Sequence, residues 1–168
     1  MGCLLEGAFA ERRYSVVGID LTEAMLDIAK RHNTYNNVSF KLADAAQMRF
    51  ADDQFDVSSV SLTLHEMPSL VRERVLSETV RVTALDGIIM IVEYTIPPTN
   101  AWHALLVRLA RWGGGKYFAE FVTSDFRGLL NKVGIQIERE VPIPMGLVKV
   151  TRGVNKEFRE KRISTCSY

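Results

Sequence analysis

The chain has 168 residues, of which 47% are apolar and 24% are charged, a composition that indicates a folded globular protein and excludes a disordered one. Its net charge of +1 gives no field that would attract nucleic acid or an anionic membrane. Two cysteines are too few for a disulfide framework, no His or Cys cluster has zinc spacing, and no apolar run reaches the ~18 residues of a membrane span, so we expect a cytoplasmic protein without a metal.

The first third of the chain alternates helix and strand patterns. Residues 4–12 have apolar side chains at helical spacing, and the start MGCLLEGAFAERR lacks the basic region of a signal peptide. Residues 14–20 are a β-branched run that predicts a strand ending at Asp20. A second strand is predicted over residues 38–45 and carries Asp44 near its end. Thr22 is a suitable N-cap for the helix between these strands, whose expected inner face is Ala24, Met25, Ile28 and Ala29.

The middle of the chain continues the alternation. A third strand is predicted over residues 55–64. The next helix begins at Pro68 and Ser69 and runs to about Val82, with an inner face of Leu70, Val71, Val75, Leu76 and Val80. The Asp86-Gly87 turn then opens residues 87–96, the most apolar run of the chain. Such a run, without alternation, is typical of a parallel strand that is covered on both faces.

The last third predicts two helices and a hairpin. Residues 101–112 form a helix with Trp102 and Trp112 on one side, which packs in the core, covers an apolar pocket or rests on a membrane surface. The glycines at 113–115 would act as a hinge. Residues 124–133 predict a helix that ends at Gly134, a suitable C′ residue. Strands over 135–141 and 147–153 are too close for a parallel crossover and therefore form an antiparallel hairpin.

This order of elements predicts an α/β fold. Alternating strands and helices are expected to form a doubly wound, mostly parallel sheet with helices on both faces, to which the hairpin adds an antiparallel strand. No repeat or linker is visible, so we expect one domain over residues 1–153. Residues 154–168 form a basic tail, which is a solvated end or, alternatively, a phosphate-binding patch.

Polar residues at the predicted strand ends carry most of the functional information. Ligands of open parallel sheets bind outside the carboxyl ends of the strands. Asp20 could accept hydrogen bonds from both hydroxyls of a ribose, or it could cap the helix that follows. Asp44 could accept from an adenine amino group, or local backbone amides could satisfy it. Two such acids on adjacent strands favour a nucleoside site.

Two further strand ends carry polar pairs, His65-Glu66 and Glu93-Tyr94. His65 could orient a substrate or accept a proton, or it could cap its loop and pack against the next helix. We expect Glu66 to be a solvated residue at the entry to a helix.

With these residues in this order, the sequence resembles the class I S-adenosylmethionine-dependent methyltransferases of the small-molecule type, which include the ubiquinone and menaquinone C-methyltransferases. The resemblance covers residues 2–153. YSVVGIDLTEAML resembles the motif whose acidic residue holds the ribose of the cofactor. NVSFKLADAAQMRFADDQFDVSSVSLTLHEMP resembles the stretch that carries the adenine contact, and FVTSDFRGLLNKVGIQIEREVPIPMGLVKVTRG resembles the closing helix and hairpin.

The resemblance implies methyl transfer from S-adenosylmethionine to a small-molecule acceptor, such as a quinone precursor or a lipid headgroup, with no metal and no nucleic acid. His65 would face the acceptor, as would Tyr94 or Tyr117. The cofactor contacts that it implies are Gly2 from the end of the glycine loop, Asp20 on the ribose, Leu21, Asp44 and Ala45 around the adenine, and Ser61.

The sequence departs from the family at its start. The family's first strand and most of its Asp-x-Gly-x-Gly-x-Gly loop are missing, and that strand is central, between those ending at Asp20 and Leu64. Its loss would leave the backbone groups of two strand edges unpaired, and each such buried group costs about 1–3 kcal/mol. We therefore expect a truncated protein. The alternatives are direct pairing of the two exposed strands, or a partner or second copy that fills the gap.

Two other functions stay open. The first is a non-catalytic methyltransferase-like subunit that acts through association, for instance as a homodimer. The second is a nicotinamide-dependent oxidoreductase, whose strands also end in a ribose-binding acid. The closing hairpin and the lack of a G-x-G-x-x-G loop argue against the oxidoreductase.

Overall fold

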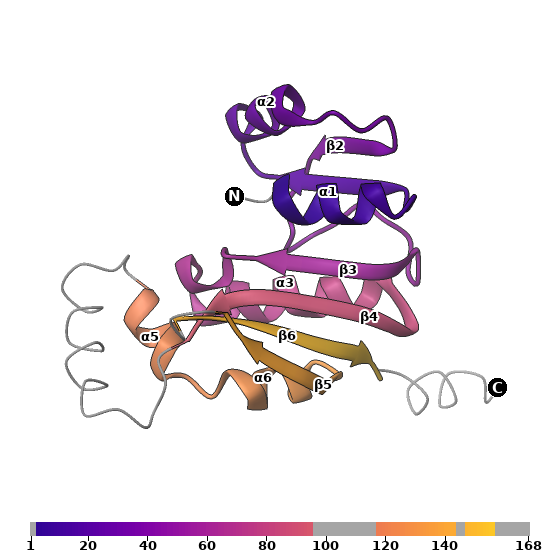
Figure 1. The fold of residues 1–168 in the computed structure, drawn as a ribbon. Helices are drawn as coiled ribbons and strands as arrows, with labels where there is room; N and C mark the ends of the chain where they lie inside the picture. The colour runs from indigo at the N-terminus through magenta and orange to yellow at the C-terminus, as the bar shows by residue number, and fades with distance from the viewer. Residues whose placement is uncertain (1–2, 96–116, 144–146, 157–168) are drawn as a thin grey trace. The chain divides into compact units, whose positions relative to one another are not determined.

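The computed structural model describes residues 3–95, 117–143 and 147–156. Its contacts divide the chain into two compact units, Met1–Arg49 and Phe50–Tyr168 (Figure 1). Each unit is described by itself below. Gly2, the predicted tryptophan helix at 101–112, the glycines at 113–115 and the tail beyond residue 156 lie outside the described residues.

The first unit is built on two parallel strands. It contains α1 (Cys3–Glu11), β1 (Val16–Asp20), α2 (Glu23–His32) and β2 (Val38–Leu42). The two strands pair in register from Val16 with Val38 to Asp20 with Leu42. Asn37 ties α1 to this sheet, because its side-chain amide donates to the carbonyls of Ala10 at 2.9 Å and Tyr14 at 2.7 Å. The predicted elements are confirmed here, although the second strand ends at Leu42 rather than at residue 45.

The predicted inner face of α2 is wrong. Leu26 is the buried residue of this helix, whereas Met25 and Ile28 are 44% and 47% exposed. The helix turns the side with Leu26 inward, and the predicted stripe did not include that residue. Thr22 does occupy the N-cap position, yet its side chain makes no cap bond within the helix.

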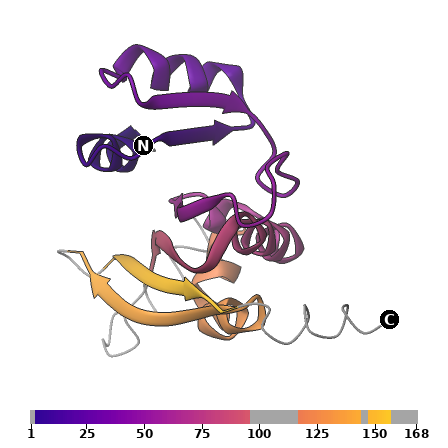
Figure 2. The ribbon, with the colours of Figure 1, turned by 90° about the vertical axis from the view of Figure 1, so that its right-hand side faces the viewer.

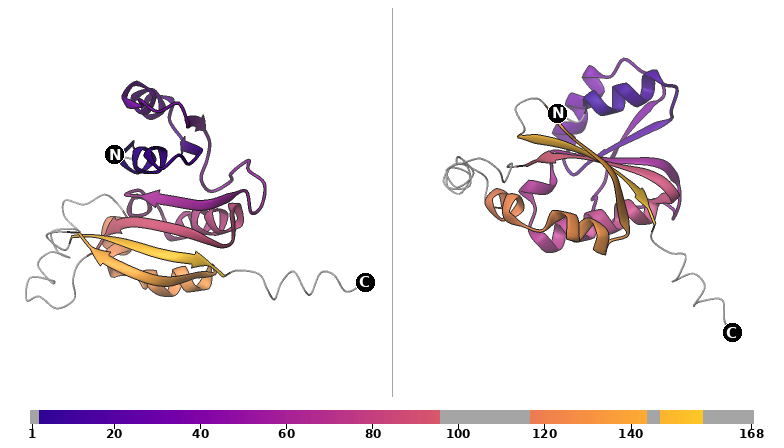
Figure 3. Two further views of the ribbon diagram at one scale, coloured as in Figure 1. Left: turned by 45° about the vertical axis from the view of Figure 1, so that its right-hand side comes forward. Right: turned by 60° about the horizontal axis from the view of Figure 1, so that its bottom comes forward.

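The second unit is a four-stranded mixed sheet with helices. The elements are β3 (Phe55–Ser61), η1 (Leu64–Glu66), α3 (Ser69–Val82), β4 (Thr83–Tyr94), α5 (Phe118–Thr123), α6 (Phe126–Lys132), β5 (Ile135–Pro142) and β6 (Val148–Asn155). The strands lie in the order β3-β4-β6-β5; β3 pairs with β4 in parallel, and both β4–β6 and β5–β6 are antiparallel, which confirms the closing hairpin. Figures 2 and 3 show α3 and α6 on the same face of this sheet.

Several element boundaries in this unit differ from the prediction. β3 ends at Ser61 because Leu62 adopts a left-handed backbone with φ of 49°. β4 begins at Thr83, before the expected turn, and Asp86, with φ of 62°, lies at an irregularity inside the strand. The helix α5 was not predicted. Gly134 is confirmed as the C′ residue of α6, with φ of 92° and its N–H bonded to Asn131.

The core of the second unit lies under the helix-covered side of β4. Ile89, Ile91 and Glu93 are buried, whereas the residues between them are only half-buried, so β4 alternates instead of being covered equally on both faces. Leu70 is 72% exposed and does not belong to the inner face of α3, while Arg72 is buried there in its place. The predicted burial of Val75, Leu76 and Val80 on that face is confirmed.

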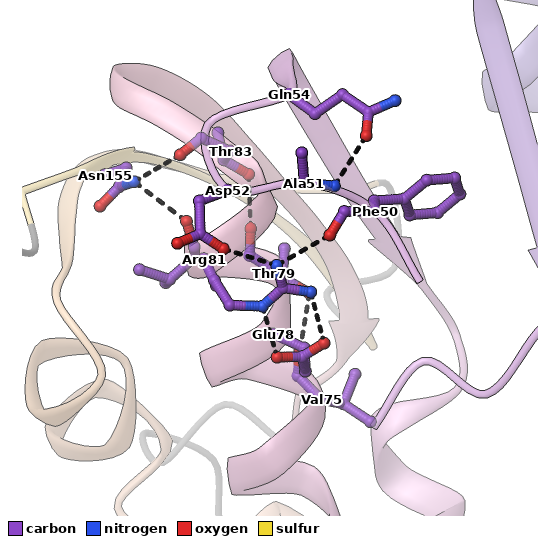
Figure 4. Close-up of polar contacts among 11 residues, drawn as sticks. Phe50, Ala51, Asp52, Gln54, Val75, Glu78, Thr79, Arg81, Thr83 and Asn155 are labelled. Atoms are coloured by element: carbon purple, nitrogen blue, oxygen red, sulfur yellow. Dashed lines mark hydrogen bonds and ion pairs between the residues drawn. The ribbon is translucent and has the colours of Figure 1, made fainter. Parts of the chain in front are cut away.

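Polar contacts fix the junction of α3 and β4, at the start of β4 (Figure 4). Arg81 donates to both carboxylate oxygens of Glu78, to Asp52 at 2.7 Å and to the carbonyl of Phe50 at 2.9 Å. Hydrogen bonds to the two carboxylates raise the pKa of Arg81. The guanidinium therefore anchors the turn before β3 to the end of α3.

Asn155 completes this junction from β6 and gives a test of it. Its buried side-chain amide donates to the carbonyls of Val80 at 3.1 Å and Thr83 at 2.7 Å. Because Asn155→Ala leaves these carbonyls without that donor, we expect the free energy of unfolding to fall by about 1–3 kcal/mol. Urea denaturation measures this change. The exposed Asn131→Ala should stay within about 0.5 kcal/mol of wild type, and equal losses in both variants would contradict the assignment.

The strands β1 and β3, which were expected to flank the family's missing strand, belong to separate sheets. Among the described residues β1 pairs only with β2, and β3 pairs only with β4. Direct pairing of the two strands, one of the alternatives above, stays a prediction. The α/β class is confirmed, while the single domain over residues 1–153 stays a prediction.

Candidate functional site

Asp20 is the last residue of β1, and the start of α2 engages its carboxylate. Its Oδ1 accepts hydrogen bonds from the backbone N–H and the hydroxyl of Thr22, both at 2.8 Å. A role at the helix entry, the alternative to a ribose contact, is therefore present in the structure. The second oxygen, Oδ2, has no partner among the described residues, so the carboxylate keeps an acceptor for a ligand hydroxyl.

Asp44 lies two residues beyond β2 and is engaged in the same way. Its Oδ1 accepts from the N–H of Ala46 at 2.8 Å, and its carbonyl accepts from the N–H of Gln47 at 3.1 Å. A local backbone amide thus satisfies one oxygen of this exposed side chain. This arrangement is the one that was expected if Asp44 does not contact an adenine. Here too the other carboxylate oxygen has no partner among the described residues.

The two aspartates share one edge of the first unit's sheet. Asp20 pairs with Leu42, and the N–H of Ala43 donates to the carbonyl of Asp20 at 3.0 Å. Because the strands are parallel, the chain leaves both at the same carboxyl edge, and Asp44 follows directly there. The adjacency expected from the sequence is therefore present within this unit.

Apolar side chains stand exposed beside these acids. Leu21 is 65% exposed and follows Asp20, and Leu42 is 55% exposed at the end of β2. Ala45, the other predicted adenine contact, is half-buried. A carboxylate with an unengaged oxygen next to exposed leucines suits the hydroxyls of a ribose and the apolar face of a purine. The residues of this unit thus fit the adenosine part of the implied cofactor.

A second polar cluster lies in the other unit, where β3 and β4 end. Ser61 is the last residue of β3 and pairs with Val92. The N–H of the next residue, Leu62, donates to the carbonyl of Val92 at 2.8 Å, which holds the chain to β4 as it turns away. The segment from 62 to 67 then passes the end of β4 and carries His65.

Glu93 organises this segment from the end of β4. Its side chain is buried, with the residue 3% exposed. Its Oε1 accepts from the backbone N–H groups of Thr63 and Leu64, both at 2.7 Å, and its Oε2 lies 2.9 Å from Nδ1 of His65. Two backbone donors and the imidazole thus meet the two oxygens of one buried carboxylate.

Aromatic rings enclose the imidazole of His65, whose side chain is 11% exposed. The ring of Tyr94 meets it edge to face with 4.8 Å between centroids, and Phe118 and Phe121 of α5 stand at 5.6 and 6.4 Å. The structure thus brings together His65 and Tyr94, both predicted from the sequence, while Tyr117 directly precedes α5. Glu66, 74% exposed at its side chain, is the solvated residue that was expected.

Arg72 supports the same segment from α3. Although it is only 1% exposed, its guanidinium donates to the carbonyls of Leu64 at 3.1 Å and Met67 at 2.9 Å. It also lies 4.9 Å from the ring centroid of Phe121 and 3.8 Å from a carboxylate oxygen of Glu120. Burial lowers the pKa of Arg72, and the carboxylates of Glu120 and Glu93 act in the opposite direction.

The sequence does not assign a role to two residues of this cluster. Glu93 is a polar strand end without a predicted function, and Arg72 is not among the predicted site residues. An acid that interrupts the most apolar run of a chain is a signal for the first. An arginine between Val71 and Val75 gives only a weak signal for the second, because such positions are usually solvated.

The structure shows neither a metal centre nor a spanning helix in the parts of the chain that it describes. There, no three His, Cys, Asp or Glu side chains gather closely enough to hold a metal ion. None of the described helices combines the length and the apolar character that crossing a membrane requires.

The amino-acid sequence of the chain matches a known protein family. The model of a methyltransferase domain family matches residues 2–91. Over 97 residues the chain is 31% identical to the demethylmenaquinone methyltransferase of Paenarthrobacter aurescens, a match that covers 58% of this chain and 37% of that protein. Over 81 residues it is 32% identical to the ubiquinone/menaquinone biosynthesis C-methyltransferase of Campylobacter jejuni, covering 48% and 33%. The matches thus span little more than a third of these relatives' length.

Solved structures agree on the fold. A SAM-dependent methyltransferase from Methanosarcina mazei superposes with a TM-score of 0.67 at 20% identity, covering 89% of this chain and 85% of that one. At this identity the likeness shows a shared fold and carries no residue roles.

Proposed function

The chain belongs to the methyltransferase domain family, and from that premise we propose that it binds S-adenosylmethionine and takes part in methyl transfer to a small-molecule acceptor. The observation that carries this proposal is the shared carboxyl edge of β1 and β2, where Asp20 and Asp44 stand beside exposed leucines. The relatives' names favour a quinone precursor as the acceptor.

The proposed cofactor contacts divide by chemistry. The carboxylate of Asp20 binds the ribose hydroxyls through its unengaged oxygen, and Leu21 packs on the adenine. Asp44 and the backbone of Ala45 bind the polar edge of the adenine. Gly2 and Ser61 complete the set that the family resemblance implies.

The cluster around His65 in the second unit is proposed to bind the methyl acceptor. His65 and Tyr94 face the acceptor, and the aromatic rings around His65 exclude water from it. When bound, the cofactor supplies an already activated methyl group on a sulfonium, so the protein mainly has to align the two reactants. No described residue is needed as a nucleophile.

We further propose a cytoplasmic protein that neither requires a metal nor binds nucleic acid. A non-catalytic role through association remains the second candidate, because β1 and β3 each pair with a single strand in the described part of the chain. That role predicts a dimer by light scattering and no cofactor binding.

Isothermal titration of the chain with S-adenosylhomocysteine tests the cofactor part. We expect saturable heat with about one ligand per chain, since the carboxylate and leucines of the first unit supply both polar and apolar contacts. NADH, titrated with its fluorescence monitored, is the control for a nicotinamide enzyme and should give no change. A flat titration with S-adenosylhomocysteine from a folded chain would contradict the proposal.

A further inference from the structure

We propose that Glu93 is a positioning residue, which fixes His65 in the tautomer with a proton on Nδ1. The unprotonated Nε2 can then take a proton from the molecule that receives the methyl group. This inference rests on the proposed function for its chemistry. The contact between the carboxylate and the imidazole carries it.

The tautomer follows from a count of donors around Glu93. Its Oε1 accepts two backbone N–H groups at 2.7 Å, and its Oε2 also receives the N–H of Tyr94 at 3.3 Å. An ionised carboxylate has no hydrogen to give, so the hydrogen in the 2.9 Å contact with His65 must belong to Nδ1. A neutral imidazole with its proton on Nδ1 has its free lone pair on Nε2.

The surroundings hold the ring in this orientation. Glu93 is 3% exposed, so a rotation of the imidazole that faced a carbon toward Oε2 would take one hydrogen-bond partner away from a buried carboxylate. Tyr94 and Phe118 contact the ring edge to face. Arg72 is hydrogen-bonded to the carbonyls on either side of His65, so the segment that carries the ring is fixed as well.

The other nitrogen stays available. Within the described ranges Nε2 makes no hydrogen bond; Oε1 of Glu66 lies 3.8 Å from it, beyond hydrogen-bond distance, on a side chain that is 74% exposed. Glu66 can therefore move away from the ring without loss of burial, whereas Glu93 cannot. The two carboxylates beside His65 thus differ: Glu93 is buried and contacts Nδ1, and Glu66 is exposed near Nε2.

This geometry selects a class of acceptor. In the step that it supports, the acceptor's O–H or acidic C–H proton moves to Nε2 of His65. The electron pair of the acceptor forms the bond to the methyl carbon, while the carbon–sulfur bond breaks and its electrons remain on sulfur as a neutral thioether. The acceptor is therefore a molecule with a dissociable proton, such as a phenol, hydroquinone or enol, and not a tertiary amine or a thioether.

Nitrogen-15 NMR of the imidazole tests the tautomer in the whole chain. The wild type should show a protonated Nδ1 and an unprotonated Nε2 for His65, assigned by the signals that His65→Asn removes. In Glu93→Gln the amide oxygen still accepts from Thr63 and Leu64, but the amide nitrogen now donates to Nδ1. The pattern should therefore reverse, with the proton on Nε2.

Two matched variants control for charge. Glu66→Gln removes the exposed carboxylate near Nε2, and Glu140→Gln changes another glutamate of the same sheet, which is paired with Lys149 and Arg127. Both should keep the wild-type tautomer. A proton on Nε2 of His65 in the wild type would overturn the proposal, and this result does not depend on the folding of Glu93→Gln. An unchanged pattern in Glu93→Gln would overturn it as well.

Kinetics separate this inference from the proposed function. With a phenolic acceptor, Glu93→Gln should lower kcat about 100-fold, with KM and S-adenosylhomocysteine affinity unchanged. Wild-type kcat in a variant whose tautomer has reversed would overturn the proton-accepting role of His65. Absence of cofactor binding in the wild type would contradict the proposed function alone, because the NMR spectra still decide whether Glu93 fixes the ring.

Discussion

Arg72→Met is expected to lower the free energy of unfolding by about 2–4 kcal/mol. The methionine fills a similar volume but offers no donor to the carbonyls of Leu64 and Met67, which lie in a buried part of the second unit. It also loses the contact of the guanidinium with the ring of Phe121. Glu120, 49% exposed at its side chain, is left with access to water and adds little to the loss.

Urea denaturation followed by circular dichroism measures this change. Arg74→Met, an exposed position of the same helix, is the matched control and should shift the free energy by less than about 0.5 kcal/mol. If both variants unfold at the wild-type midpoint, the carbonyls of this segment do not depend on Arg72.

Asp20→Asn is expected to weaken S-adenosylhomocysteine binding about 10- to 100-fold. The amide oxygen can still accept from Thr22, so the turn into α2 is retained. The second position of the side chain becomes an NH₂ group, which cannot accept a hydrogen bond from a ribose hydroxyl, and the charge is lost. Binding should therefore fall without a matching loss of stability.

The titration described for the wild type measures the affinity of the variant. Asp27→Asn on α2 removes one exposed carboxylate of the same unit, in an ion pair with Lys30, and should bind like the wild type. An Asp20→Asn chain with unchanged affinity would leave Asp20 with its helix-entry role only, and the proposed ribose contact would be wrong.

The sequence predicted those parts of the fold that depend on local chemistry. The β-branched run before Asp20, the closing hairpin and the end of α6 at Gly134 were all recognisable, because chain direction, turn length and glycine's positive φ are encoded within a few residues. The end of β3 was misplaced by three residues, since the left-handed backbone of Leu62 has no signature in the side chain.

Burial was harder to predict than secondary structure. On α2 the predicted stripe with Met25 and Ile28 is exposed and Leu26 is buried, because the side that a helix turns inward depends on the strands it packs against. For the site, the strand-end acids and His65 could be found by position. Arg72 could not, because its burial depends on how the preceding segment turns to present the carbonyls of Leu64 and Met67 to it.

Because β1 pairs only with β2 among the described strands, its backbone amide protons are expected to exchange with solvent at different rates. The N–H of Val16 donates to Asn37, and donors alternate sides along a strand, so Gly18 faces β2 while Val17 and Ile19 face the opposite side. No described residue accepts from these two amides. In deuterium oxide they should therefore lose their protons well before Gly18 does, and an intermolecular strand that docked along them would slow that loss first.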